Sequence, residues 1–128
     1  MPLESSFIKF LQEAFPTVPV YSFYIPEDAP SPAFCIENAG YGIATNYYGE
    51  DSILNRTIKL TVSSTDISDI YNDKHLRSYI ESASALNELP ILKARITNFS
   101  DSLNREQKIY ERTYTITIKF KEPPLWVV

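Results

Sequence analysis

The chain has 128 residues, of which 44% are hydrophobic and 22% charged, with a net charge of −4. This size and composition are typical of one globular domain with a buried core, and we assign it residues 1–122, followed by a C-terminal tail, 123–128. No apolar run approaches the roughly 20 residues of a membrane-spanning helix, and the first residues lack a signal sequence, so we expect no membrane partner and a cytosolic product.

Charge is unevenly distributed along the chain. Residues 1–54 hold seven acidic residues and one basic residue, a net −6, whereas residues 55–128 hold nine acidic and eleven basic residues, a net +2. Two explanations stay open: charges spread by chance over a solvated surface, or head-to-tail self-association in which an acidic patch contacts a basic one. An acidic chain without a basic cluster argues against tight nucleic-acid binding.

The first part of the chain predicts one helix and two strands. Apolar residues at helical spacing predict a helix over residues 4–15. Residues 18–25 favour a strand, and Pro19, which lacks an amide donor, indicates an edge position or the start of a strand. After a proline-rich connection, residues 33–38 alternate in polarity and predict a short second strand.

A segment rich in glycine and tyrosine follows at residues 40–51. It holds all three glycines of the chain and three of its nine tyrosines. Glycine gives the backbone conformational freedom, and tyrosine gives a large contact area for two side-chain torsions. We expect a contact loop, mobile in the free subunit and ordered by a neighbour, whose contact residues are Tyr41, Tyr47, Tyr48, Glu50 and Asp51.

The middle of the chain predicts a strand and then helical structure. Residues 55–64 alternate between apolar and polar side chains, which indicates a strand with one buried face. Asp66 is placed to cap a turn or short helix over 66–71, with Asp69 in the position of a capping box. Apolar spacing then predicts a helix over 72–89.

The last part of the chain predicts a long hairpin. We expect a strand over 91–98, a polar loop over 99–107 and a strand over 108–121. Fourteen residues exceed the usual strand length, so the last strand projects beyond the sheet or carries a bulge. The tail contains the only tryptophan, Trp126, and either packs back on the core or docks on a neighbour.

These elements predict an α+β fold. We expect a mostly antiparallel sheet of about five strands with two helices packed on one face, in the order α-β-β-β-α-β-β.

No pattern of catalytic or metal-binding residues is found. His75 and Cys35 are the only histidine and cysteine, too few for a zinc site, and we expect a solvated imidazole and a buried, inert thiol. The acidic residues do not match a calcium loop, and the glycines do not match a phosphate-binding loop. We therefore expect no enzymatic activity, no cofactor and no metal.

Basic residues on polar strand faces leave a nucleic-acid-binding domain as an alternative. They could line one surface of the sheet, with strand tyrosines stacking on bases. Tyr110 and Tyr114, however, share a face with Ile116, which predicts burial instead. The basic residues concerned are Arg56, Lys59, Lys93, Arg95, Lys119 and Lys121.

The order of elements resembles a known family. A helix around Phe7–Leu11 is followed by a proline-rich step into Pro32–Ile36, the alternating strand Thr57–Ser64, a helix ending in Ala85–Leu89 and the closing strand Tyr114–Phe120. This order resembles the tail terminator (tail completion) proteins of long-tailed bacteriophages and related minor capsid proteins.

The resemblance implies a virion protein, assembled in the host cytoplasm, that forms a hexameric ring. Such a ring caps the tail tube and joins it to the head connector, so the implied partners are further copies of the chain, the tail tube protein and the head–tail connector. It implies no sequence-specific nucleic-acid binding, although DNA can pass through the ring. A head-closure ring or a tube subunit is the alternative within this class. Beyond the contact loop, the expected interface residues are Arg56, Lys93, Arg95, Arg105, Lys119 and Trp126.

Overall fold

The structure is a computed structural model of the chain. It describes residues 3–26, 30–41, 45–46, 52–86, 89–91, 93–106 and 108–122. Within these ranges, only the backbone is described for residues 3–4, 38–41, 45–46, 52–55, 89–90 and 120–122.

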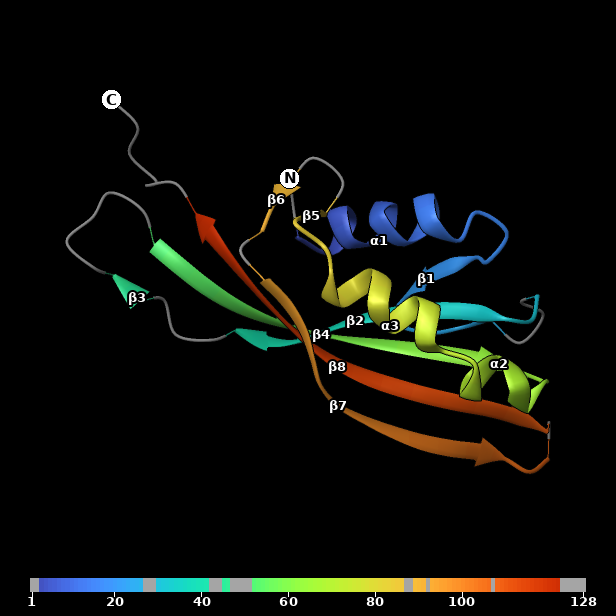
Figure 1. Cartoon of the computed structure of the whole chain (residues 1–128). Coiled ribbons are helices and arrows are strands. Elements are labelled where there is room, and N and C mark those ends of the chain that lie inside the picture. Colours follow the sequence, from blue (N-terminus) through green and yellow to red (C-terminus); the bar gives the residue numbers. More distant parts are fainter. Residues whose placement is uncertain are drawn as a thin grey trace.

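A mixed sheet forms the base of the fold, and three helices lie over one of its faces (Figure 1). The main path of the sheet runs β1-β2-β4-β8-β7, with the short β3 paired to β4, while β5 and β6 form a separate small hairpin. The pair β1 and β2 is parallel, and the other pairs are antiparallel. The elements in chain order are α1 (Leu3–Ala14), β1 (Val20–Ser22), β2 (Ala33–Tyr41), β3 (Thr45–Asn46), β4 (Ser52–Ser64), α2 (Ile67–Tyr71), α3 (Lys74–Glu81), β5 (Ala85–Leu86), β6 (Leu89–Pro90), β7 (Lys93–Asn104) and β8 (Ile109–Glu122).

This architecture confirms the predicted α+β fold with a mostly antiparallel sheet of five principal strands. The helices α1 and α3 and the strands β1, β2, β4, β7 and β8 follow the predicted order. α2 is the short helix expected over 66–71, and the short strands β3, β5 and β6 are additional. β1 lies at the sheet edge, as Pro19 immediately before it predicted.

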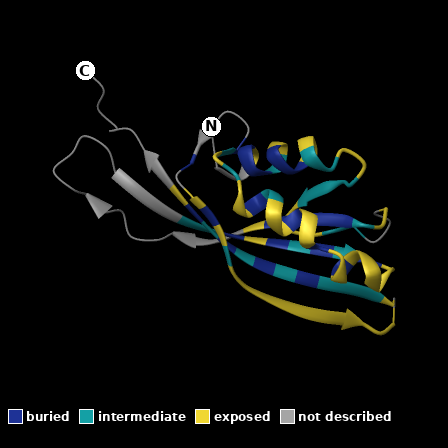
Figure 2. Ribbon diagram, in the orientation of Figure 1, coloured by how far each residue is buried: buried dark blue, intermediate teal, exposed yellow. Residues whose placement is uncertain are grey.

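The apolar face of the sheet and the helices enclose the core (Figure 2). In β4 and β8 every second residue points into this core, which is the alternation that the sequence predicted. On the helix side, Phe7 and Leu11 of α1 and Ile80 of α3 are fully buried. The hydrophobic residues of β4 and β8 with no more than 1% exposure are Ile58, Leu60, Tyr114, Ile116 and Ile118.

The predicted helix over 72–89 is wrong in its second half. α3 ends at Glu81, and Ala85–Leu86 then pair with Leu89–Pro90 as a hairpin. Leu86 is fully buried in this arrangement, so the apolar spacing reflects burial and not a continued helix. The serines that follow α3 disfavour helix because their hydroxyls compete for backbone hydrogen bonds.

The predicted loop over 99–107 is also wrong, because β7 continues to Asn104 against β8. Only the short stretch around Arg105 forms the turn. β8 spans the predicted fourteen residues, and it is β7 that carries an irregularity of register, between Ile96 and Asn98.

Among the described residues, no helix is both long enough and apolar enough to cross a lipid bilayer.

Candidate functional site

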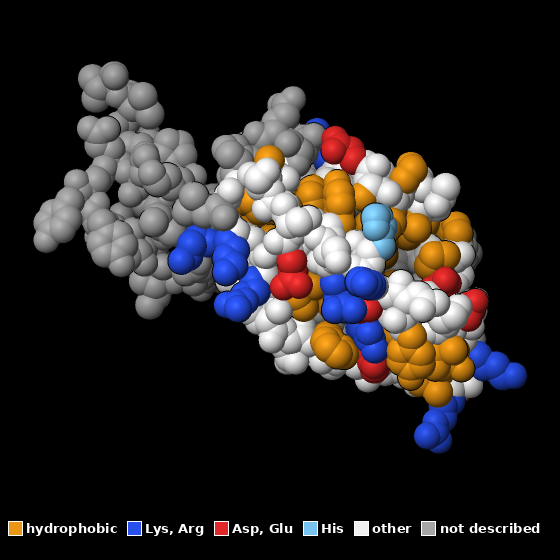
Figure 3. Space-filling view, in the orientation of Figure 1, with side chains coloured by type: hydrophobic (Ala, Val, Ile, Leu, Met, Phe, Trp, Pro, Cys, Tyr) orange, Lys and Arg blue, Asp and Glu red, His pale blue; other side chains and the backbone are white. Residues whose placement is uncertain are grey.

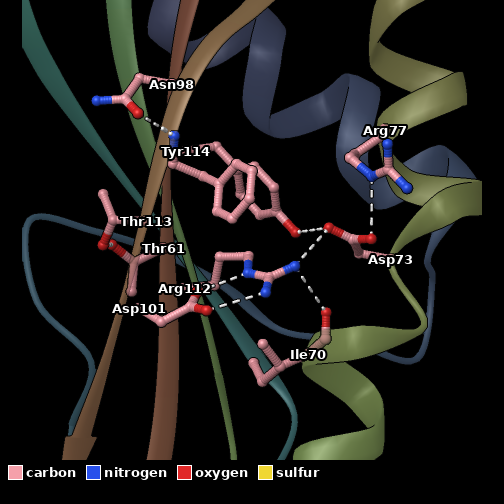
Figure 4. Close-up of polar contacts among 10 residues, drawn as sticks. Thr61, Ile70, Asp73, Arg77, Asn98, Asp101, Arg112, Thr113 and Tyr114 are labelled. Atoms are coloured by element: carbon pink, nitrogen blue, oxygen red, sulfur yellow. Dashed lines mark hydrogen bonds and ion pairs between the residues drawn. The ribbon is translucent and has the colours of Figure 1, made fainter.

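Arg112 of β8 lies on the helix-covered face of the sheet, where its side chain is only 10% exposed (Figure 4). Its Nε and one terminal nitrogen donate to the two carboxylate oxygens of Asp101 in β7, at 2.6 and 2.9 Å. The other terminal nitrogen donates to Asp73 at 3.1 Å and to the carbonyl oxygen of Ile70 at 3.3 Å. One guanidinium therefore connects β7, β8, the end of α2 and the start of α3.

Asp73 precedes α3 and is 5% exposed. A residue in this position usually caps its own helix through the side chain, but here the carboxylate makes no such bond. It instead accepts hydrogen bonds from the hydroxyl of Tyr114, from Arg112 and, at 3.0 Å, from Arg77 (Figure 4). The helix start is thus fixed to the sheet by a charged group.

The protonation states in this cluster favour hydrogen bonds and ion pairs among its own members. Burial opposes ionisation of Asp73, but the hydrogen bonds from Tyr114, Arg77 and Arg112 outweigh it and hold the pKa of this carboxyl below its usual value. The hydrogen bond from Arg112 likewise lowers the pKa of Asp101. Burial, and then the hydrogen bond to Asp73, raise the pKa of Tyr114. Near neutral pH both carboxylates are charged, Tyr114 is neutral, and the positive charge of Arg112 is fully engaged within the protein.

The shift of register in β7 assembles this cluster. Arg95 lies opposite Thr117, on the face away from the helices, whereas Phe99 lies opposite Tyr114 and Asp101 opposite Arg112. Because one extra residue reverses the alternation of a strand, the shift turns Phe99 and Asp101 toward the helix side. Without it, the carboxylate of Asp101 would point away from Arg112.

Exposed apolar side chains surround the cluster and form what we call the apolar patch. The Arg112 guanidinium lies 4.6 Å from the ring centre of Phe99 and 5.7 Å from that of Tyr71, so both rings flank it. Hydrophobic side chains are visible over α2 and beside β7 in Figure 3. The members of the apolar patch, with their exposed fractions, are Ile67 (40%), Tyr71 (63%), Phe99 (51%) and Leu103 (47%).

β7 gives this region an open sheet edge. Among the described strands it pairs with β8 alone, and no described helix lies over its second half (Figures 1 and 2). Residues 97–104 are all exposed. A long unpaired edge beside apolar side chains is a ready site for pairing with another chain.

The opposite face of the sheet is polar and divides into two regions of different charge. At one end Lys93 lies opposite Lys119, and Arg95 is the next basic residue along the same face. At the other end a groove of about 370 Å³ includes Glu37 and Glu111 and no lysine or arginine among its described wall residues, while Lys59 lies opposite Glu37 in the neighbouring strand. Cys35 lies in this groove, 5% exposed; burial and then these two carboxylates raise the pKa of its thiol.

The structure brings together only some of the predicted interface residues. Lys93, Arg95 and Lys119 share the open face, and Arg105 lies at the far end of β7 in the turn. Arg56 was expected on the same surface, but it lies opposite Ile118 and so belongs to the helix-covered face. The side chains of Tyr41 and Lys121 lie outside the described residues, as do Tyr47, Tyr48, Glu50, Asp51 and Trp126.

The other residues singled out in the sequence are placed as follows. His75 is exposed, as predicted, with its ring edge-on to Phe15 at 5.6 Å between centres. Asp66 does cap α2, through a hydrogen bond from the backbone nitrogen of Ser68 at 3.0 Å. Asp69 does not complete a capping box; its carboxylate accepts from the hydroxyl of Ser64 at 2.6 Å.

The cluster around Arg112 was missed in the sequence, although a signal was present. Arg112 falls on the same alternation as Tyr110, Tyr114 and Ile116, which the sequence assigned to the buried face. A buried arginine requires an acidic partner, so the alternation was enough to predict an ion pair of Arg112 with an acidic residue such as Asp73 or Asp101.

Among the described residues, no group of three or more histidine, cysteine, aspartate or glutamate side chains is arranged to hold a metal ion. No protein-family model matches the sequence, and no curated protein matches it.

Proposed function

We propose that this chain is an assembly protein that acts through contacts with further copies of itself and with other proteins of a larger particle. The observation that carries the proposal is the apolar patch beside the free edge of β7. A patch of this kind on one face of a small domain is typical of a contact surface. The role is steric and geometric, without catalysis.

The cluster around Arg112 suits such a surface. Its charges are paired with one another, and it ties β7 to α2 and α3. Tyr71 and Phe99 are held against the guanidinium, so the apolar patch keeps its shape before a partner arrives. Preorganisation of this kind lowers the entropic cost of association.

Within this class, the specific function we propose is that of a phage tail terminator. The support is the resemblance of the sequence, and the order of the main elements agrees with it except that Ala85–Leu86, quoted there as part of a helix, is strand β5. The chain would form a closed ring that covers the end of the tail tube and offers a new surface to the head connector. A head-closure ring or a tube subunit is the nearest alternative.

A second candidate, single-stranded nucleic-acid binding, is favoured by one observation. Lys93, Arg95 and Lys119 gather on the open face of the sheet, where a phosphate backbone could lie. Tyr114, which was considered as a stacking residue, is buried at 1% exposure and faces the helices. The basic group is small, and we rank this function below assembly.

The test is a mass measurement in solution combined with electron imaging of the chain mixed with purified tail tubes. The terminator function predicts rings, in solution or at tube ends only. Substitution of Leu103 by Ser, in the apolar patch, should weaken ring formation, whereas Tyr24→Ser should not, because Tyr24 is 72% exposed but lies in another surface region. A strict monomer that leaves tube ends bare would exclude the terminator function. Salt-dependent retention on DNA, lost on substitution of Lys93 and Lys119, would favour the second candidate.

A further inference from the structure

The apolar patch and the C-terminal tail lie at opposite ends of the long strand β8. Arg112, which the patch surrounds, is near the start of β8, opposite Asp101. The last residue of β8, Glu122, lies opposite Ser52 at the other end of the sheet. The two ends are separated in Figure 1, where α2 and the second half of β7 lie at the opposite end of the sheet from the last residues of β8. The tail therefore begins far from the apolar patch of its own chain.

The distance keeps Trp126 from the Leu103 end of the patch of the same chain. The patch residue nearest to the tail along the sheet is Phe99, opposite Tyr114, eight positions before Glu122. Eight positions of extended strand span about 26 Å. Trp126 follows Glu122 by four residues, which reach at most about 14 Å when fully extended. The backbone of Trp126 therefore ends about 12 Å short of Phe99, and Leu103, opposite Tyr110, lies four positions or about 13 Å farther, which is beyond the reach of the Trp126 side chain.

We propose that the segment Leu125–Val128 of one copy docks on the apolar patch of the next copy, along the free edge of β7. This inference rests on the proposed assembly function and names the contact through which copies join. The segment is Leu-Trp-Val-Val, four apolar residues that favour extended structure. Pro123 and Pro124, which precede it, restrict the backbone and so reduce the entropy lost on docking.

The C-terminal segment and the apolar patch are chemically complementary. Between Asn98 and Leu103, no described strand other than β8 pairs with β7, so its outer edge can accept an added strand, and Phe99 and Leu103 project from it toward the helix side. Apolar side chains of the added segment would cover these two residues and the neighbouring Tyr71. The indole of Trp126 provides the large aromatic anchor that such interfaces commonly use.

The contact is heterologous, because tail and patch are different surfaces. Every copy that gives its tail to one neighbour leaves its own apolar patch free for the tail of another. Repetition of such a contact closes into a ring or extends into a filament. The proposed terminator ring requires the closed case.

Complementation between two defective variants tests the contact. The tail variant carries Leu125→Ser and Trp126→Ser, and the patch variant carries Phe99→Ser and Leu103→Ser. Each alone should lose self-association, with the dissociation constant raised at least about tenfold. When the two variants are mixed, they should form heterodimers. Assembly should end at the heterodimer, because the only intact tail and the only intact patch are both used in that contact. Ile67→Ser with Leu103→Ser serves as a second patch variant, should Phe99→Ser disturb folding as judged by far-UV circular dichroism.

The single tryptophan gives a direct measure of binding that does not depend on ring formation. A chain with Trp126→Phe contains no tryptophan, so tryptophan emission in a mixture with a synthetic peptide of residues 122–128 comes from the peptide alone. We expect this emission to shift to shorter wavelength as the chain is added, and the shift to disappear when the patch substitutions are introduced into the same Trp126→Phe chain. Tyr24→Ser, the matched control in another exposed aromatic residue, should leave the shift unchanged.

The outcomes separate this inference from the proposed function. The tail contact is wrong if the tail variant forms the same rings as the unmodified chain. It is also wrong if the patch substitutions leave the shift of the peptide's tryptophan emission unchanged. Neither result contradicts the assembly function. If the peptide binds the patch but the intact chain forms no ring in solution or on tubes, the terminator function is wrong and the contact stands. If the two variants do not pair when mixed, the docking between copies is excluded.

Discussion

Replacing Arg112 with methionine removes the cation that links two strands and two helices. Methionine keeps much of the aliphatic volume, so the main loss is electrostatic. The substitution leaves the Asp73 carboxylate, 5% exposed, with fewer donors. Removing one partner of a buried ion pair costs about 3 to 5 kcal/mol. We expect the lower limit, about 3 kcal/mol, because Tyr114 and Arg77 still donate to Asp73. The bond to Asp101 adds little, since that carboxylate is 47% exposed.

For a chain of this length, a loss of about 3 kcal/mol lowers the melting temperature by about 10 °C. Urea unfolding followed by far-UV circular dichroism measures the free energy of unfolding directly. Arg95→Met is the matched control, because Arg95 is an exposed arginine of the same sheet, and it should change the free energy by less than about 0.5 kcal/mol. Adding Asp73→Asn to Arg112→Met should recover part of the loss by removing the unpaired charge. If Arg112→Met is no more destabilising than Arg95→Met, the ion pair does not hold these elements together.

Three further predictions concern the same structure. The pKa of Asp73 is held below its usual value in the folded chain, so its stabilising effect is present above the unfolded value of about 3.9 and is lost as the pH falls toward the folded value. Acid titration of the unfolding free energy should therefore show a fall below about pH 4 that Asp73→Asn reduces; an unchanged slope would contradict this. Tyr114→Phe removes one buried hydrogen bond to Asp73 and should cost about 1 to 2 kcal/mol in urea unfolding, while a neutral effect would mean that the bond contributes nothing. The thiol of Cys35 is 5% exposed and its pKa is raised by burial, so alkylation should be much slower in the folded chain than in urea. Equal alkylation rates would show that the thiol is accessible.

The sequence predicted the parts of the fold that depend on local periodicity. The alternation in β4 and β8 and the apolar spacing of α1 are strong local patterns, and each of these elements was placed within three residues of its observed ends. The end of α3 was misplaced because Leu86 is buried equally well in a helix and in the hairpin that replaces its last turns. Periodicity identifies a buried position without stating which element buries it.

The candidate site depended on a feature with no local pattern. Phe99 and Asp101 reach Arg112 only because β7 shifts register between Ile96 and Asn98, which reverses the side-chain alternation beyond that point. If the register shift is not known, the polar residues after Asn98 fit a loop better than a strand. The long β8 strand was the available clue, since a fourteen-residue strand requires a neighbour of similar length to satisfy its backbone groups.

The proposed function requires that copies of this chain join through defined surfaces to make a ring. The most direct measurement is the mass distribution of the purified chain in solution and on purified tail tubes, by light scattering and electron imaging. The proposed function predicts closed rings at the tube ends, in solution as well or on the tubes alone, and weaker ring formation when Leu103 is replaced by Ser. A chain that stays monomeric at every concentration and leaves tube ends uncapped would contradict it.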